Sequence, residues 1–221
     1  MRKEIIQTVI KPYMKSKAFN NKGRLFTKDL GLFQIEVEIQ SQRYYKDEGS
    51  ENFRIKYSLV CSELTELSGW TLSFTGGSIS EESSWIEINQ QTDTERLRKW
   101  LLCELDSMMD KFENLYSVEY LLEIWKKYSN DFQYLFLLMK FKPEQLDEWE
   151  NDKILEMQNL DAELQELSYE KSEQEKRKDC LDKEMRIGGL QMKIDKILSA
   201  KKCIFRAMDF IKCNINSLSS D

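Results

Sequence analysis

Two glutamates at alternate positions of one segment are the residues in this sequence best suited to chemistry. Residues 33–40 alternate apolar and polar side chains without interruption, which is the pattern of a half-buried strand. Glu36 and Glu38 would then point to the same face of the sheet. Together with Asp29 or Asp47 they would offer oxygen ligands to Mg²⁺, as in a metal-dependent hydrolase or nuclease.

The same two glutamates also suit a sheet face that simply contacts water. Nuclease sites of this kind use a lysine two residues after the second acid, whereas this sequence has Gln40 there. Residues 53–61 alternate in the same way, so Arg54 and Lys56 would oppose the glutamates across neighbouring strands. Exposed faces of antiparallel sheets normally carry such mixed charges. We therefore predict a solvated face without a cofactor, and keep the metal site as the alternative.

The sequence contains no histidine, which excludes Ser-His-Asp and Cys-His nucleophile systems and His-ligated metals. Its five cysteines are odd in number and widely spaced, which indicates free thiols in a reducing, cytoplasmic compartment. We expect Cys61 and Cys103 to be buried as small apolar residues and not to act as nucleophiles. No apolar run approaches the roughly 18 residues of a membrane span.

Two further motifs have ordinary structural interpretations. The sequence Gly76-Gly77-Ser78 lacks the Gly-Lys-Ser/Thr ending of a phosphate-binding loop, so we expect a turn between strands. The basic run Lys176-Arg177-Lys178 is interrupted on both sides by acids, which favours a solvated helix face. A net charge of −6 also argues against a general nucleic-acid binder.

The elements that would position these residues indicate an α+β fold. Residues 3–16 have helical apolar spacing, with Pro12 expected to kink that helix or to start a second one. A β-meander should follow, with helix covering one face. We expect Trp70, Trp85, Trp100 and Trp125 in its core. The expected strands are 24–28, 33–40, 53–61, 70–74 and 85–88.

Helices should occupy the rest of the chain. Thr92 and Glu95 have the spacing of a capping box for a helix to about residue 112, and Ser117 is placed to cap the next one. A third helix is expected over 131–141, which is almost entirely apolar. We place a domain boundary at Lys142-Pro143, giving an α+β domain over 1–142 and a helical region over 143–221.

The region after Pro143 has the pattern of an antiparallel coiled-coil hairpin. Leu160, Leu164 and Leu167 lie on a heptad seam, which continues through the polar positions Lys171, Gln174 and Lys178. Gly188-Gly189 is the expected point of reversal. The first arm is strongly acidic and the returning arm basic, so opposite charges favour the antiparallel arrangement.

The N-terminal part of the sequence resembles a bacterial family known as domain-of-unknown-function family 4304. The resemblance covers residues 1 to about 128. It implies a helix–sheet–helix pattern but no activity, so it assigns no catalytic residue. The coiled region lies outside it. The residues that carry it are Ile10-Lys11-Pro12, Phe19, Gly23, Phe26, Val37-Glu38-Ile39-Gln40-Ser41, Phe53-Arg54-Ile55, Trp85-Ile86-Glu87-Ile88 and Thr92-Asp93.

These patterns favour a non-enzymatic protein–protein interaction or scaffolding module. We expect an accessory subunit of a bacterial multi-protein complex, with antiviral defence as one setting. A protein partner should bind the hairpin, and a homodimer is left open. The alternatives are a hydrolase or nuclease at the strand carboxylates and nucleic-acid binding through the basic return helix. The partner-binding candidates are Leu160, Leu164, Leu167, Lys171 and Lys178.

Overall fold

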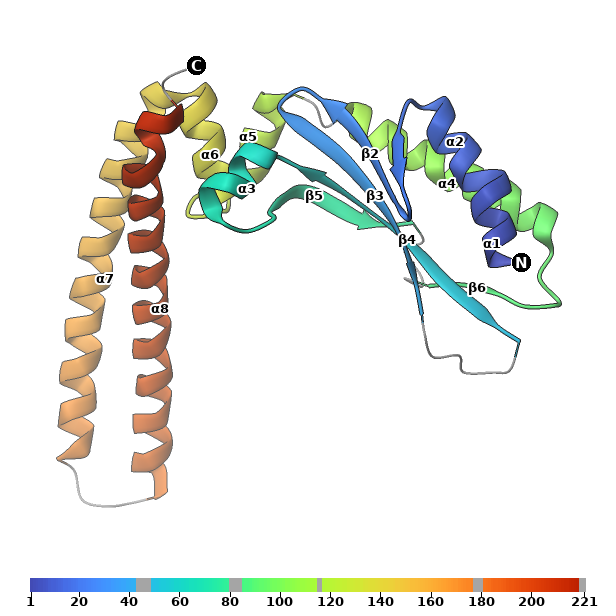
Figure 1. Ribbon diagram of the computed structural model, residues 1–221. Coiled ribbons are helices and arrows are strands. Elements are labelled where there is room, and N and C mark those ends of the chain that lie inside the picture. The colour runs from blue at the N-terminus through green and yellow to red at the C-terminus, as the bar shows by residue number, and fades with distance from the viewer. Residues whose placement is uncertain (43–48, 80–84, 115–116, 177–180, 219–221) are drawn as a thin grey trace. The chain divides into compact units, whose positions relative to one another are not determined.

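A computed structural model describes residues 1–42, 49–79, 85–114, 117–176 and 181–218 of the chain (Figure 1). The chain forms two compact units, Met1–Leu121 and Leu122–Asp221. The fold is α+β, as the sequence predicts. The division lies N-terminal to the predicted boundary at Pro143, so the helix over 132–141 belongs to the same unit as the hairpin. Independent folding of residues 1–142 stays a prediction.

The first unit contains an antiparallel sheet in the order β1-β2-β3-β4-β5, with β6 also paired to β4 (Figure 1). Strand β3 is flanked by β2 and β4, which confirms that residues 33–40 form a central strand. The strands are β1 (Asn20–Lys22), β2 (Leu25–Leu30), β3 (Phe33–Ser41), β4 (Glu51–Val60), β5 (Ser73–Ser78) and β6 (Ile86–Ile88).

The alternation predicted from the sequence separates the two faces of this sheet. Ile35 and Val37 on β3 are fully buried, as are Ile55 and Leu59 on β4. The residues between them point to the opposite face. Gly31 has a positive φ of 83° and begins the turn from β2 to β3, and its amide donates to Asp29 Oδ1 (2.8 Å). A side chain at that φ would be strained, so glycine fixes the register here.

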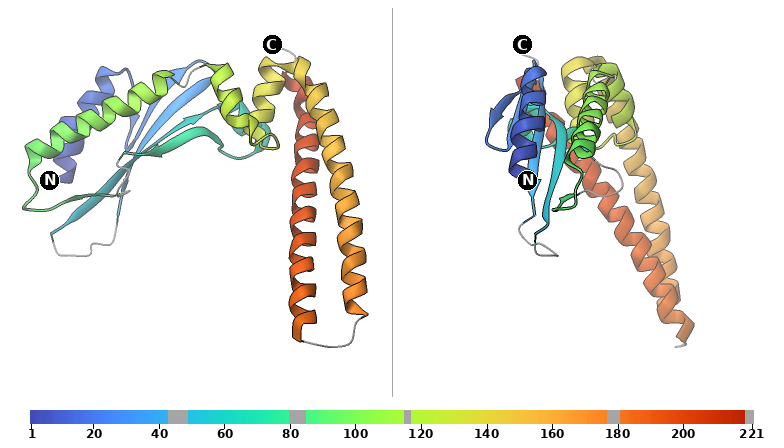
Figure 2. Two further views of the ribbon diagram at one scale, coloured as in Figure 1. Left: turned by 180° about the vertical axis from the view of Figure 1, so that it is seen from behind. Right: turned by 90° about the vertical axis from the view of Figure 1, so that its right-hand side faces the viewer.

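Helices cover the buried face of the sheet (Figure 2). The N-terminal helix has three parts: α1 (Arg2–Ile5), the π-helix η1 (Ile6–Ile10) and α2 (Lys11–Ser16). Pro12 lies in the first turn of α2, where it needs no amide donor. The backbone at Ile10 and Lys11 is helical, so the helix continues through a π-helical turn into α2 and no separate second helix starts at the proline.

The long helix α4 (Thr94–Asn114) lies beside the N-terminal helix. Tyr13 donates a hydrogen bond to Asp106 (2.6 Å), and the ring of Phe112 meets that of Tyr57 on β4 edge to face, at 5.5 Å. The helix is capped by Asp93, whose Oδ1 accepts from the amides of residues 95 and 96. The predicted cap Thr92 instead exchanges hydrogen bonds with Asn89.

Three predictions about the first unit are wrong. The strand predicted over 70–74 begins only at residue 73 and continues to 78, and residues 70–72 join it to helix α3 (Ser62–Ser68). Trp70 is 72% exposed and does not belong to the core. Residues 75–78 form most of β5 and not a turn. The alternation of Trp70 and Leu72 is typical of a strand, whereas Gly76 and Gly77 inside the observed strand are typical of a turn.

The second unit is built from helices. It contains α6 (Phe132–Phe141), the short 3₁₀-helix η2 (Pro143–Gln145), α7 (Leu146–Glu175) and α8 (Leu181–Leu218). Helix α5 (Val118–Lys126) crosses the division between the units, and Ser117 caps it as predicted, accepting from the amide of Tyr120 (3.0 Å). Helices α7 and α8 form the predicted antiparallel hairpin (Figures 1 and 2).

The predicted reversal point of the hairpin is wrong. Gly188 and Gly189 lie inside α8, and the chain reverses between the end of α7 at Glu175 and the start of α8 at Leu181. Two hydrogen bonds join the arms of the hairpin, Lys171 to Gln191 and Lys201 to Asp161. In each pair the two residues are equally far in sequence from position 181. A reversal at the glycines would move the register of one arm by several turns and separate both pairs.

Because both glycines lie in an exposed helix, alanine should stabilise the hairpin. A Cβ built at Gly188 or Gly189 would contact no atom within 4 Å. We expect Gly188→Ala and Gly189→Ala each to raise the free energy of unfolding by about 0.5–1 kcal/mol, measured by urea denaturation. Gly31→Ala, at a positive φ, should destabilise and is the control. Destabilisation by both alanines would contradict a continuous α8.

Candidate functional site

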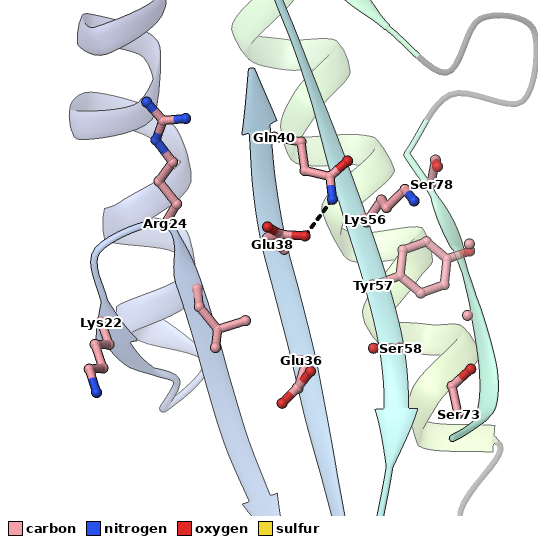
Figure 3. Close-up of a pocket in the computed structure, with 13 residues that line it drawn as sticks. Lys22, Arg24, Glu36, Glu38, Gln40, Lys56, Tyr57, Ser58, Ser73 and Ser78 are labelled. Carbon is pink, nitrogen blue, oxygen red and sulfur yellow. Dashed lines mark hydrogen bonds between the residues drawn. The ribbon is translucent and has the colours of Figure 1, made fainter. Parts of the chain in front are cut away.

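The exposed face of the sheet carries an open groove of about 760 Å³ (Figure 3). Figure 3 shows Glu38 and Glu36 one after the other along β3, with Lys22 and Arg24 on one side and β4 and β5 on the other. The charged residues lining the groove are Lys22, Arg24, Glu36, Glu38 and Lys56, and its serines are Ser58, Ser73 and Ser78.

Polar side chains form a ladder across this face. Lys56 lies directly opposite Glu38 in the β3–β4 register, which confirms the predicted cross-strand pairing. Arg54 lies opposite Gln40 and donates to its Oε1 (2.7 Å), and Gln40 Nε2 donates to Glu38 (2.5 Å). Glu36 faces Ser58 and not a basic residue. Gln40 therefore joins charges of both signs, at the position where a nuclease would have lysine.

The geometry gives the metal alternative only two of its carboxylates. Asp29 pairs with Gln34, two residues along β3 from Glu36, and Asp47 lies outside the described residues. Within the described ranges, no three acidic, cysteine or histidine side chains gather in a group that could hold a metal ion. Glu36 and Glu38 thus share a face as predicted, without a third described ligand.

Close packing explains the two glycines in the groove. A Cβ at Gly76 would lie 2.8 Å from the carbonyl oxygen of Tyr57, and one at Gly77 would lie 2.7 Å from the Tyr57 hydroxyl. Gly76 is therefore needed for β5 to pair with β4, whereas a side chain at Gly77 would require the Tyr57 ring to move. They form no phosphate loop, and sequence reasoning missed this role because the close approach of Tyr57 is a tertiary feature.

The described cysteines are free thiols in two environments. Cys61 is fully buried, as predicted, whereas Cys103, Cys203 and Cys213 are exposed. The prediction that Cys103 is buried is wrong, because the stripe of α4 that packs inward runs through Leu101, Leu105 and Met108 and leaves position 103 on the outer side.

The three leucines proposed for partner binding lie in the seam of the hairpin. Leu167 is buried in a cluster with Leu190, Ile194 and Ile197, and Leu160 and Leu164 pack against that cluster. The same apolar pattern was open to two interpretations, a partner-binding stripe or an internal helix pair. The closed hairpin uses these leucines for the internal pair.

The seam becomes polar toward the reversal. Lys171 donates to Gln191 Oε1 (2.8 Å) and lies 3.8 Å from Glu175. Lys178, the last partner-binding candidate, lies outside the described residues. Three large apolar side chains in this part of the hairpin point away from the seam: Tyr169, Met185 and Met192 are 70%, 72% and 65% exposed. The heptad register predicts Met185 as a seam position, and its exposure shows that this prediction is wrong. Nothing in the sequence singled out Tyr169 or Met192.

The other end of the hairpin holds a small cavity of about 250 Å³ beside α7. Lys153 lies in its wall, is only 8% exposed and pairs with Glu156 (2.7 Å). Trp149 donates from its indole nitrogen to the carbonyl of Ser129 (2.8 Å). Burial, with a smaller contribution from Glu148, raises the pKa of Tyr134. These contacts hold α7 in place, and the heptad pattern gave no sign of a buried lysine.

Comparisons with known proteins identify no relative: no family model, no curated protein and no solved structure matches the chain. The resemblance to domain-of-unknown-function family 4304 therefore stays a prediction. None of the helices in the described ranges has the length and apolar character that crossing a membrane requires.

The sheet face should tolerate a charge reversal. Because Glu38 is exposed, we expect Glu38→Lys to lower the free energy of unfolding by no more than about 1 kcal/mol. Ile35→Ala, on the buried face of the same strand, should cost about 2–5 kcal/mol. Urea denaturation followed by tryptophan fluorescence measures both. A collapse of folding in Glu38→Lys would show that this carboxylate has a structural role that its exposure does not indicate.

Proposed function

We propose that this chain is a non-enzymatic protein-interaction module that docks a protein partner through the distal part of its helical hairpin. The distal part comprises α7 from Leu167 to Glu175 and α8 from Leu181 to Ile197. One observation carries the proposal: Tyr169, Met185 and Met192 are all at least 65% exposed. Burial of each of these side chains by a partner would contribute about 1.5–3 kcal/mol.

The residue types suit a binding surface. Tyrosine and methionine are enriched in protein interfaces, and methionine adapts its shape to different partners. The polar seam nearby supports the same interpretation. Lys171 donates a hydrogen bond to Gln191 there, so this part of the hairpin buries little apolar surface between its own helices. We keep Lys171 and Lys178 as partner-binding candidates for this reason, and propose no contact for the three seam leucines while the hairpin is closed.

The biological setting is a proposal from architecture alone. A small α+β domain with a long helical arm suits an accessory subunit of a larger cytoplasmic bacterial assembly, such as a defence complex. Fold analogy of this kind assigns no partner. The sheet groove does not favour an enzymatic alternative, because Glu38 accepts a hydrogen bond from Gln40 and the described residues include no group of three acidic, cysteine or histidine side chains that could hold a metal ion.

Site-specific photocrosslinking in cells tests the docking surface. A photoreactive phenylalanine analogue at Tyr169 or Met192 should give one discrete adduct with a different protein, and the same analogue at the exposed Lys15 of α2 should not. Met185→Ser should reduce the adduct at Met192, because Met185 lies one heptad away on the same side of α8.

The matched control is Leu102→Ser, which removes a comparably apolar exposed residue (39%) from α4. This variant should leave the adduct unchanged. The proposal is contradicted if Tyr169 and Met192 give no more adduct than Lys15, or if Met185→Ser has no greater effect than Leu102→Ser while circular dichroism shows that both variants fold.

A further inference from the structure

One flank of the hairpin exposes apolar side chains in its proximal half, away from the reversal. The ion pair between Asp161 and Lys201 joins the two helices on this flank. Ile154 lies seven residues before Asp161 on α7, so it occupies the same stripe of that helix. Leu198 and Phe205 lie three residues before and four residues after Lys201, so they share its side of α8. They are 45%, 49% and 53% exposed.

The opposite flank of α8 is already covered within the unit. Ala207 and Phe210 are buried there, and the ring of Phe210 stacks on Phe132 of α6 at 4.4 Å. Helix α8 therefore contacts α7 on one side and α6 on a second side. The flank of Leu198 and Phe205 is its third apolar side. We define the proximal flank as Ile154, Asp161, Leu198, Lys201 and Phe205.

Charge indicates what would cover the proximal flank. Helix α7 has eleven acidic and two basic residues, a net charge of −9, whereas α8 has four acidic and eight basic residues, a net charge of +4. The pairing of α7 with α8 inside one hairpin leaves α7 with excess negative charge. A second basic helix beside α7, and a second acidic helix beside α8, would extend the complementarity.

We infer that the proximal flank binds a second copy of this chain, with the two-fold axis parallel to the hairpin. This axis places α7 of each copy against α8 of the other, acid against base. A perpendicular axis would instead place α7 against α7, acid against acid. The contacts across the hairpin set the level of each residue, so Ile154 would meet Phe205 of the second copy in a four-helix arrangement.

This inference deepens the proposed role in protein interaction but uses a different surface. The proposed function rests on the distal side chains Tyr169, Met185 and Met192, and the dimer rests on the proximal flank. A monomer that still gives the distal crosslinks would overturn the dimer alone. A dimer without distal crosslinks would contradict the proposed docking surface alone.

Analytical ultracentrifugation of the full chain tests the dimer. We expect a concentration-dependent dimer whose dissociation constant increases with salt, since opposite charges are screened. Leu198→Ser with Phe205→Ser should raise the dissociation constant by about 100-fold or more. Met185→Ser with Met192→Ser, which removes exposed apolar residues outside this flank, should leave it within about threefold, because scattered exposed residues away from an interface contribute little.

Cysteine crosslinking tests the axis. The described exposed cysteines Cys103, Cys203 and Cys213, and also Cys180, are first replaced by serine. A mixture of Ile154→Cys chains and Phe205→Cys chains should then form the mixed disulfide-linked dimer in preference to either symmetric one. The inference is overturned by a chain that stays monomeric at high micromolar concentration, by a dimer that survives the Leu198 and Phe205 substitutions, or by links that form mainly between two Ile154→Cys chains.

Discussion

The apolar seam between α7 and α8 is the interaction on which the functional account depends. Leu167, Leu190, Ile194 and Ile197 bury one another, and this contact fixes the register in which every outward-facing side chain of the hairpin is presented. Most helical stability in proteins comes from the packing of an apolar face, and α7, with 30 residues, packs its apolar face in this seam. The seam therefore supplies stability, while side chains outside it such as Tyr169, Met185 and Met192 face solvent.

The two units differ in what their surfaces can do. The sheet of the first unit exposes a groove lined by charges of both signs, and Gln40 in its wall hydrogen-bonds to Glu38 and to Arg54. Charged and polar side chains on an exposed sheet face are stable in contact with water, so this face has less reason to bind a partner. The hairpin instead presents large apolar side chains to solvent in the distal part, on the proximal flank and at Leu155 of α7. Covering exposed apolar groups with a partner lowers the free energy of the complex, whereas covering the polar sheet face would lower it little.

Local patterns predicted the elements of this fold better than the contacts that decide their limits. The alternation of residues 33–40 and the heptads after residue 143 require only neighbours in sequence, and both elements occur as predicted. The strand at 73–78 was missed because Gly76 and Gly77 resemble a turn until Tyr57 is seen to pack against them. The predicted reversal at Gly188-Gly189 is wrong because the low helix propensity of glycine is a weaker constraint than packing in the seam. That packing places Leu167 against Leu190, Ile194 and Ile197 of α8. The exposure of Tyr169, Met185 and Met192 likewise depends on which stripe of each helix the seam uses.

The register of the hairpin decides which side chains face outward, and double electron–electron resonance between spin labels measures that register. In a chain without its native cysteines, labels at Tyr169 and Lys193 should give a shorter distance than labels at Tyr169 and Asp209. Position 209 lies about 24 Å farther along the helix axis in a register centred on position 181. The distances should persist on dilution with unlabelled chain, because they arise within one molecule. A shorter distance for the 169–209 pair, or a signal that disappears on dilution, would contradict the account.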